Sequence, residues 1–191
     1  MIHKLLIICC LFSTQILFAQ TGQNFDANLK QMGVTGPVKM VPHSNIAPDP
    51  TDYKAVGSPL PTFIVQDVQH KIYTNKDVQY NGNLLVMIFN PTCSHCEAMT
   101  DMLEKNIKLF SKSKVLMVAT AGQEPYLKDF EERHHTADYP TMKVTFDSSK
   151  MTDRLFNYKM LPQINVYDRD RKLIKTLNGT LPIDSFKAYI Q

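Results

Sequence analysis

Residues 84–100 read Leu84-Leu-Val-Met-Ile-Phe-Asn-Pro-Thr-Cys-Ser-His-Cys-Glu-Ala-Met-Thr100, and this stretch predicts the centre of the fold. The apolar run over residues 84–89 is typical of a strand that is buried on both faces. Asn90-Pro-Thr interrupts the run, and a helical pattern of apolar residues begins at the first cysteine. The sequence therefore predicts a strand, a tight break and a helix with a Cys-X-X-Cys pair at its N-terminus.

The position of this pair suits thiol chemistry. A helix N-terminus presents free backbone N–H groups and partial positive charge, which stabilise a thiolate. We expect Cys93 at the exposed tip of the helix and Cys96 about one turn deeper on the same face. Because the thiolate is the nucleophile in disulfide exchange, Cys93 is predicted to attack and Cys96 to resolve the intermediate.

The first 19 residues have the features of a secretory signal peptide. Lys4 precedes an apolar run over residues 5–18, and Ala19 is a small residue before polar sequence. We expect cleavage near Ala19 and export to the periplasm or another extracytoplasmic compartment, where disulfides can form. A lipoprotein leader cleaved before Cys9 or Cys10, or an uncleaved anchor, is an alternative.

The rest of the chain divides into an arm and one domain. Six of the 11 prolines lie between Pro37 and Pro61, so residues 20–61 are expected to form an extended Pro-rich arm. Residues 62–191 have a length that suits one domain. The net charge is +3 and no run of lysine or arginine stands out, so the sequence gives no support to a nucleic-acid partner.

Strands alternate with helices through this domain. Residues 62–66 and 71–74 predict a β-hairpin. Further strands are predicted at residues 84–89, 115–119, 143–146, 163–167 and 173–177, and helices at residues 97–110, 125–134, 151–158 and 183–190. This order predicts an α/β fold in which helices flank a central mixed sheet, with parallel central strands, an antiparallel edge pair and an N-terminal β-hairpin extension.

Three segments together carry a resemblance to a known family. They are the hairpin at residues 63–73, the motif Pro91-Thr-Cys-Ser-His-Cys-Glu97, and Met160-Leu-Pro-Gln-Ile-Asn-Val-Tyr-Asp168. From about residue 61 to residue 191 the chain resembles the TlpA/ResA-like branch of exported thiol–disulfide oxidoreductases, which have the thioredoxin fold.

The resemblance implies a function and a set of site residues. Cys93 and Cys96 would form a redox-active disulfide, and no bound organic cofactor is implied. Leu161 and Pro162 correspond to the family's cis-proline segment, which lies against the cysteine pair and binds substrate. The implied partners are protein thiol or disulfide substrates and a membrane electron carrier.

Three positions depart from the family pattern. Thr92 stands where the family usually has tryptophan. Met87 and Met99 stand where related proteins carry an acid that accepts the proton of the buried cysteine. Glu97 is adjacent to Cys96, but neighbouring residues on a helix do not face each other. The sequence therefore leaves open which group deprotonates Cys96.

Ser94 and His95, together with Thr92, are expected to modulate the pair. Ser94-His95 resembles the histidine-bearing motifs of protein disulfide isomerase and DsbA. An imidazolium beside the Cys93 sulfur favours the thiolate and the reduced form, which makes a stronger oxidant. The family branch implies a reductase whereas His95 favours a disulfide oxidase or isomerase, so both directions stay open.

Two other classes of protein fit the motif less well. Sco-like copper chaperones share this fold but have three residues between their cysteines, and here there are two. Peroxiredoxins carry Thr-X-X-Cys, whereas Thr92 directly precedes Cys93.

The sequence predicts no metal site. A single cysteine pair offers two ligands, and zinc prefers four. The sequence spacing of the histidines does not indicate that they complete such a site with the cysteines; these histidines are His43, His70, His134 and His135. His134 and His135 are expected at the exposed end of a helix, where histidine is favourable.

Overall fold

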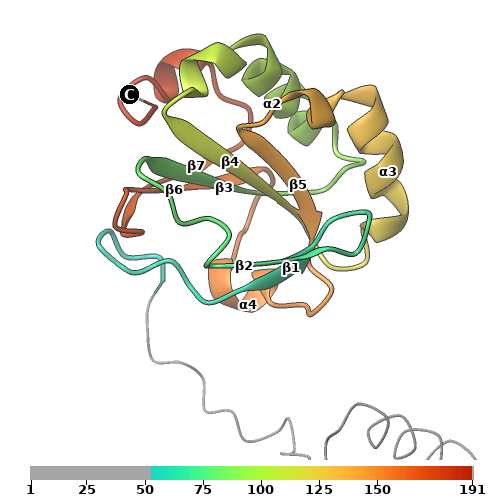
Figure 1. The fold of residues 1–191 in the computed structure, drawn as a ribbon, viewed down its shortest axis with the longest axis horizontal. Helices are drawn as coiled ribbons and strands as arrows, with labels where there is room; N and C mark the ends of the chain where they lie inside the picture. The colour runs from blue at the N-terminus through green and yellow to red at the C-terminus, as the bar shows by residue number, and fades with distance from the viewer. Residues whose placement is uncertain (1–52, 191) are drawn as a thin grey trace, which may run out of the picture. The chain divides into compact units, whose positions relative to one another are not determined.

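The strand that precedes the cysteine pair, β3 (Asn83–Phe89), lies inside a seven-stranded sheet of order β2-β1-β5-β4-β3-β6-β7 in the computed structural model (Figure 1). It pairs in parallel with β4 (Ser113–Ala119), which pairs in parallel with β5 (Met142–Phe146). β6 (Gln163–Tyr167) pairs antiparallel with both β3 and β7 (Leu173–Asn178). The predicted thioredoxin-like α/β fold with a mixed sheet is confirmed.

The predicted N-terminal hairpin is also present. β1 (Ile64–Gln66) and β2 (Ile72–Thr74) pair antiparallel. Gln66 pairs with Phe146 at the end of β5, which joins the hairpin to the main sheet. The hairpin therefore extends the sheet on the side of β5, away from β6 and β7.

The structure describes residues 53–190, so the predicted signal peptide and most of the predicted arm lie outside the described residues. The last arm residues lie against the start of β7. Leu60 N–H donates to the Arg171 carbonyl at 2.8 Å, and Gly57 N–H donates to the Leu173 carbonyl at 2.7 Å. Leu60 is buried in the core. This end of the arm therefore packs on the domain.

Two apolar layers cover the sheet because side chains alternate along each strand. In β3, residues 85, 87 and 89 face the layer that includes α2 (Ser94–Lys105) and α3 (Glu124–Arg133). Residues 84, 86 and 88 face the layer that includes α4 (Thr152–Phe156). Figure 1 shows α2 and α3 on one side of the sheet and α4 on the other. The run over residues 84–89 is buried on both faces, as predicted.

The helix that carries the cysteines is shorter than the predicted span of residues 97–110. It begins at Ser94 and ends at Lys105, and a 3₁₀ helix, η2 (Ile107–Phe110), follows. Asn106 lies between them, and its side-chain Nδ2 donates to the Met102 carbonyl at 2.8 Å. Asparagine is favoured at helix ends because its side chain competes for backbone hydrogen bonds.

The prediction of a closing helix over residues 183–190 is wrong. The only helical piece within these residues is a 3₁₀ helix, η4 (Ile183–Ser185), and turns follow it. These turns place Phe186 and Ile190 in the core. A segment of this length does not offset the cost of helix nucleation by itself, so its packing decides its conformation.

A buried arginine ties the segment before β3 to the turn between β6 and β7. Arg171 is 5% exposed and has a left-handed φ of 59°. Its Nε donates to the Val78 carbonyl at 3.0 Å, and its Nη1 donates to the Gly82 carbonyl at 2.9 Å. Further bonds reach the carbonyls of Tyr80 and Asp168. The guanidinium therefore holds the loop that leads into the central strand.

Candidate active site

Cys93 is the N-cap residue of α2, directly beyond the end of β3. Its backbone is extended, with φ −96° and ψ 119°. Its carbonyl accepts hydrogen bonds from the N–H groups of Cys96 at 2.9 Å and Glu97 at 3.0 Å. The side chain is partly exposed and makes no capping hydrogen bond. The sulfur therefore stands at the position from which N-cap side chains accept first-turn N–H bonds, where a negative charge is favoured.

Asn90 makes the break between strand and helix. Its Oδ1 accepts hydrogen bonds from both the N–H and the hydroxyl of Thr92, each at 2.8 Å. Its carbonyl accepts the Cys93 N–H at 3.1 Å. This is the local pattern by which asparagine stabilises turns. Thr92, which was predicted to modulate the pair, holds its hydroxyl on Asn90 and so orients the turn.

Cys96 lies one turn deeper and is 0% exposed, and both cysteines are free thiols. The predicted difference in burial between them is confirmed. Burial raises the pKa of Cys96 to about 12, and a hydrogen bond with Cys93 contributes to the rise. The Asn90 N–H, 3.5 Å from the Cys96 sulfur, acts in the opposite direction.

The raised pKa predicts how alkylation of Cys96 depends on pH. A thiol remains protonated below its pKa, so the rate at Cys96 should rise about tenfold per pH unit at every pH well below about 12. Timed alkylation of the reduced protein with iodoacetamide, followed by peptide mass spectrometry, measures this rate, and Cys93 should be labelled first. In denaturant, as the control, both cysteines should react at similar rates. Equal labelling of the two in the folded protein at neutral pH would contradict the prediction.

The two positions at which the sequence resemblance would place a proton acceptor are apolar. Met87 and Met99 are both buried in the same core layer as Cys96. Glu97 is turned toward α3, where its Oε1 lies 2.6 Å from Arg133 Nη1. Neither methionine can accept a proton, and the Glu97 carboxylate raises the pKa of Cys96 instead of relieving it.

The Leu161–Pro162 peptide bond is cis, as predicted. Gln163, the next residue, pairs with Ile88 near the end of β3, so the proline lies beside the turn that leads to Cys93. Leu161 and Cys93 pack against the same core layer. The fold therefore brings the predicted substrate-binding segment and the cysteine pair to one place.

The loop after β7 forms hydrogen bonds both with the proline segment and with the first turn of α2. The sequence did not indicate these contacts. Gly179 N–H donates to the Pro162 carbonyl at 2.8 Å, and the Thr180 hydroxyl donates to the His95 carbonyl at 3.2 Å. Met160 is 60% exposed and its sulfur lies beside Gly179. Met160 thus adds an exposed apolar side chain next to the proline segment. A single methionine in a sequence gives no indication that it will lie beside the site.

Ser94 and His95 have exposed side chains in the first turn of α2. If His95 stabilises the Cys93 thiolate, His95→Gln should lower the reduction potential of the pair. A tenfold loss of thiolate stabilisation corresponds to about 30 mV for a two-electron couple. Equilibration with glutathione buffers measures the shift, and His70→Gln, at another exposed histidine, is the matched control. Identical potentials for His95→Gln and the unchanged chain would make His95 a surface residue only.

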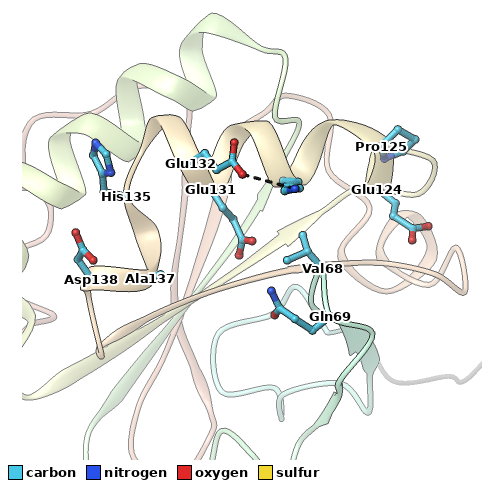
Figure 2. A pocket seen from close by; sticks show the side chains of 10 residues that line it. Val68, Gln69, Glu124, Pro125, Glu131, Glu132, His135, Ala137 and Asp138 are labelled. Atoms are coloured by element: carbon cyan, nitrogen blue, oxygen red, sulfur yellow. Dashed lines mark ion pairs between the residues drawn. The ribbon is translucent and has the colours of Figure 1, made fainter.

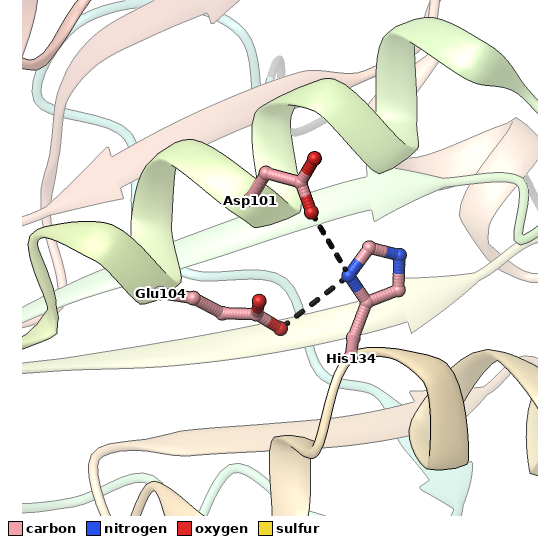
Figure 3. Close-up of side chains that lie close together, drawn as sticks. All are labelled: Asp101, Glu104 and His134. Carbon is pink, nitrogen blue, oxygen red and sulfur yellow. Dashed lines mark ion pairs between the residues drawn. The ribbon is translucent and has the colours of Figure 1, made fainter.

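The expectation that His134 is exposed at the end of a helix is wrong. α3 packs on α2, which leaves His134 only 6% exposed, whereas His135 is exposed. In Figure 3 the His134 ring points toward Asp101 and Glu104 of α2. Burial lowers the pKa of His134. Burial, with the charge of Asp101, raises the pKa of Glu104 to about 7.

A groove of about 730 Å³ lies between the β1–β2 turn and α3 (Figure 2). Acidic side chains dominate its charged lining, which includes Glu124, Glu131, Glu132 and Asp138. Neither Cys93 nor the Leu161–Pro162 segment lines it, so the groove is separate from the candidate active site.

Comparison with known proteins places this geometry in a family. The model of the AhpC/TSA family matches residues 56–176, which include both cysteines and the cis-proline segment. The chain belongs to the AhpC/TSA family. No functionally curated protein matches the sequence significantly. Among the described residues of this AhpC/TSA-family chain, no helix has the length and apolar character needed to cross a bilayer.

Solved structures share the fold of this AhpC/TSA-family member at low sequence identity. The thioredoxin domain of a thiol–disulfide oxidoreductase from Bacteroides vulgatus is 20% identical with a TM-score of 0.55, and the match covers 70% of this chain and 94% of that one. The exposed lipoprotein thioredoxin of Streptococcus pneumoniae is 22% identical with a TM-score of 0.52, over 66% and 95%. StoA of Bacillus subtilis is 12% identical with a TM-score of 0.54, over 71% and 99%.

Proposed function

We propose that this chain is an exported thiol–disulfide oxidoreductase of the TlpA/ResA-like type, which reduces disulfides in protein substrates through Cys93 and Cys96. One observation carries the proposal: a partly exposed cysteine caps the N-terminus of α2 while its partner is buried one turn below it. In such a pair the substrate disulfide can reach the sulfur of Cys93, which attacks it. The buried sulfur of Cys96 can react only with the mixed disulfide that Cys93 then forms.

The proposed reaction has two steps. The Cys93 thiolate attacks one sulfur of the substrate disulfide, which forms a mixed disulfide and releases a substrate thiolate that takes up a proton. The Cys96 sulfur, after losing its proton, then attacks the Cys93 sulfur. This step forms the Cys93–Cys96 disulfide and releases the second substrate thiol. Two electrons pass from the cysteine pair to the substrate.

The second step requires a thiolate at Cys96, which is buried without a carboxylate acceptor at residue 87 or 99. Once Cys93 is bonded to the substrate, its sulfur no longer carries the charge that disfavours a second thiolate beside it. The Asn90 N–H then stabilises the charge on Cys96. The released substrate thiolate is a base next to the site and can accept the proton.

The substrate is proposed to bind beside Leu161 and Pro162. Leu161 is half-buried and Met160 is exposed, so the side-chain contacts offered there are apolar. An extended substrate strand could also pair with the backbone of Leu161. A membrane electron carrier is the proposed source of the two electrons that restore the thiols after each cycle.

Export and the reducing direction rest on the sequence. Residues 1–19 have the pattern of a signal peptide, and the segments around the cysteines resemble the TlpA/ResA-like branch. An oxidase or isomerase of the DsbA or protein disulfide isomerase type is the second candidate. Its support is His95, which lies inside the motif with its side chain exposed.

The experiment that tests this function counts thiols. The reduced chain without residues 1–19 is mixed with excess insulin, whose disulfides serve as the model substrate. We expect each chain to lose two thiols and peptide mapping to find a Cys93–Cys96 disulfide. Thiols that stay free, or two separate and stable mixed disulfides on one chain, would overturn the proposal.

A further inference from the structure

The interface between α2 and α3 gathers three side chains of kinds that bind metal ions. Asp101 and Glu104 are three residues apart on α2 and therefore lie on one face of the helix. His134 follows the last residue of α3. Figure 3 shows the imidazole Nδ1 directed at both carboxylates.

The distances match those between ligands of one ion. His134 Nδ1 lies 3.3 Å from Asp101 Oδ1 and 3.4 Å from Glu104 Oε1. Zinc binds nitrogen and oxygen at about 2.0–2.1 Å, so neighbouring ligands of a tetrahedral zinc ion lie about 3.3–3.4 Å apart. All three ligand atoms lie within 4.8 Å of one another. The Asp101 side chain is 51% exposed. A small rotation of it would bring its carboxylate oxygen closer to that of Glu104.

One oxygen inside this cluster, Glu104 Oε1, lacks a hydrogen-bond partner. Glu104 Oε1 is buried and accepts no hydrogen bond, so its approach to His134 Nδ1 is a close contact without one. His134, whose Nδ1 faces this oxygen, is more than nine-tenths buried; its Nε2, on the side of the ring away from the carboxylates, has no hydrogen-bond partner either. Buried polar groups without partners are uncommon and indicate a missing interaction.

The charge of the cluster also fits a cation. Arg133, next to His134, is directed elsewhere: its Nη1 lies 2.6 Å from Glu97 and its Nε 2.9 Å from Asp129. Asp101 and Glu104 therefore face a buried imidazole without sharing this arginine. A divalent ion would neutralise both carboxylates and use the imidazole nitrogen as a ligand.

We propose that Asp101, Glu104 and His134 form a binding site for a first-row divalent metal ion, with Zn²⁺ as the best match to one nitrogen and two oxygen ligands. The exposed side of Asp101 is the path of entry and leaves a fourth position for water. The bound ion joins α2, which carries the cysteine pair, to α3. This site is independent of the proposed redox function.

The test is a Zn²⁺ titration of the full chain with its four cysteines replaced by serine, because thiolates would otherwise bind zinc. Competition with a chelating dye measures the affinity. We expect one ion per chain, and Asp101→Asn or Glu104→Gln should each weaken binding by about tenfold or more. Zn²⁺ should also raise the melting temperature of the parent chain and raise it less in the variants.

Asp129→Asn is the matched control, since it removes an exposed acid from α3 that lies outside the cluster and pairs with Arg133. It should bind Zn²⁺ with the parent affinity. The two carboxylate variants leave the buried His134 in place, so the test does not depend on replacing a buried ring. Absence of saturable binding, or equal affinity in the parent, Asp101→Asn and Glu104→Gln chains, would overturn the site.

Discussion

Replacing Cys93 with serine is expected to abolish disulfide exchange, whereas replacing Cys96 with serine should trap mixed disulfides. A hydroxyl at the N-cap of α2 does not attack a disulfide, so the rate of insulin reduction should fall by about three orders of magnitude or more, as when other catalytic nucleophiles are removed. With Cys96→Ser the attack by Cys93 still occurs, but the buried position no longer offers a sulfur to release the substrate.

Non-reducing gel electrophoresis and mass spectrometry would show the trapped species. Ser111→Ala, at an exposed serine beyond η2, is the control and should exchange at the parent rate. Mixed disulfides that form on Cys96 in the Cys93→Ser chain would reverse the assigned order of the two cysteines. Insulin reduction by either serine variant at the parent rate would show that the cysteine pair does not carry out the exchange.

Replacing Arg171 with methionine should destabilise the fold more than any other change considered. The guanidinium is buried and bonds to the carbonyls of Val78, Tyr80, Gly82 and Asp168. Methionine fills part of the volume but donates no hydrogen bond, so these carbonyls lose a partner. A buried polar group left unsatisfied costs about 1–3 kcal/mol, so we expect the free energy of unfolding to fall by about 3–5 kcal/mol.

Urea denaturation followed by circular dichroism measures this change. Arg169→Met is the matched control, because Arg169 lies in the same turn with an exposed side chain, and its effect should stay within about 0.5 kcal/mol. Equal unfolding midpoints for Arg171→Met and Arg169→Met would contradict a stabilising role for the hydrogen bonds between Arg171 and the segment before β3.

The sequence predicted the parts of the site that local patterns determine. The apolar run over residues 84–89, the turn at Asn90 and the helix after Cys93 are consecutive, so the burial pattern and the turn residues together indicate them. The place of Pro162 next to the end of β3 came from family resemblance, since proline alone does not indicate a cis bond.

Features that depend on distant contacts were missed. His134 looked like the exposed end of a helix, but its partners Asp101 and Glu104 lie on another helix. Arg171 lies between two predicted strands, and three of the carbonyls it binds lie about 90 positions earlier. Residues 183–190 have a helical pattern, yet contacts of Phe186 and Ile190 with the core override it. Side-chain identity alone cannot indicate such pairings.

The reduction potential of the Cys93–Cys96 pair tests the central claim most directly. The chain without residues 1–19 is equilibrated with redox buffers of known potential, and the fraction of paired thiols is measured by alkylation and mass. For a reductase we expect a single two-electron transition near that of thioredoxin, at about −270 mV. A potential near that of DsbA, at about −120 mV, would identify an oxidant, and thiols that never pair would contradict redox function altogether.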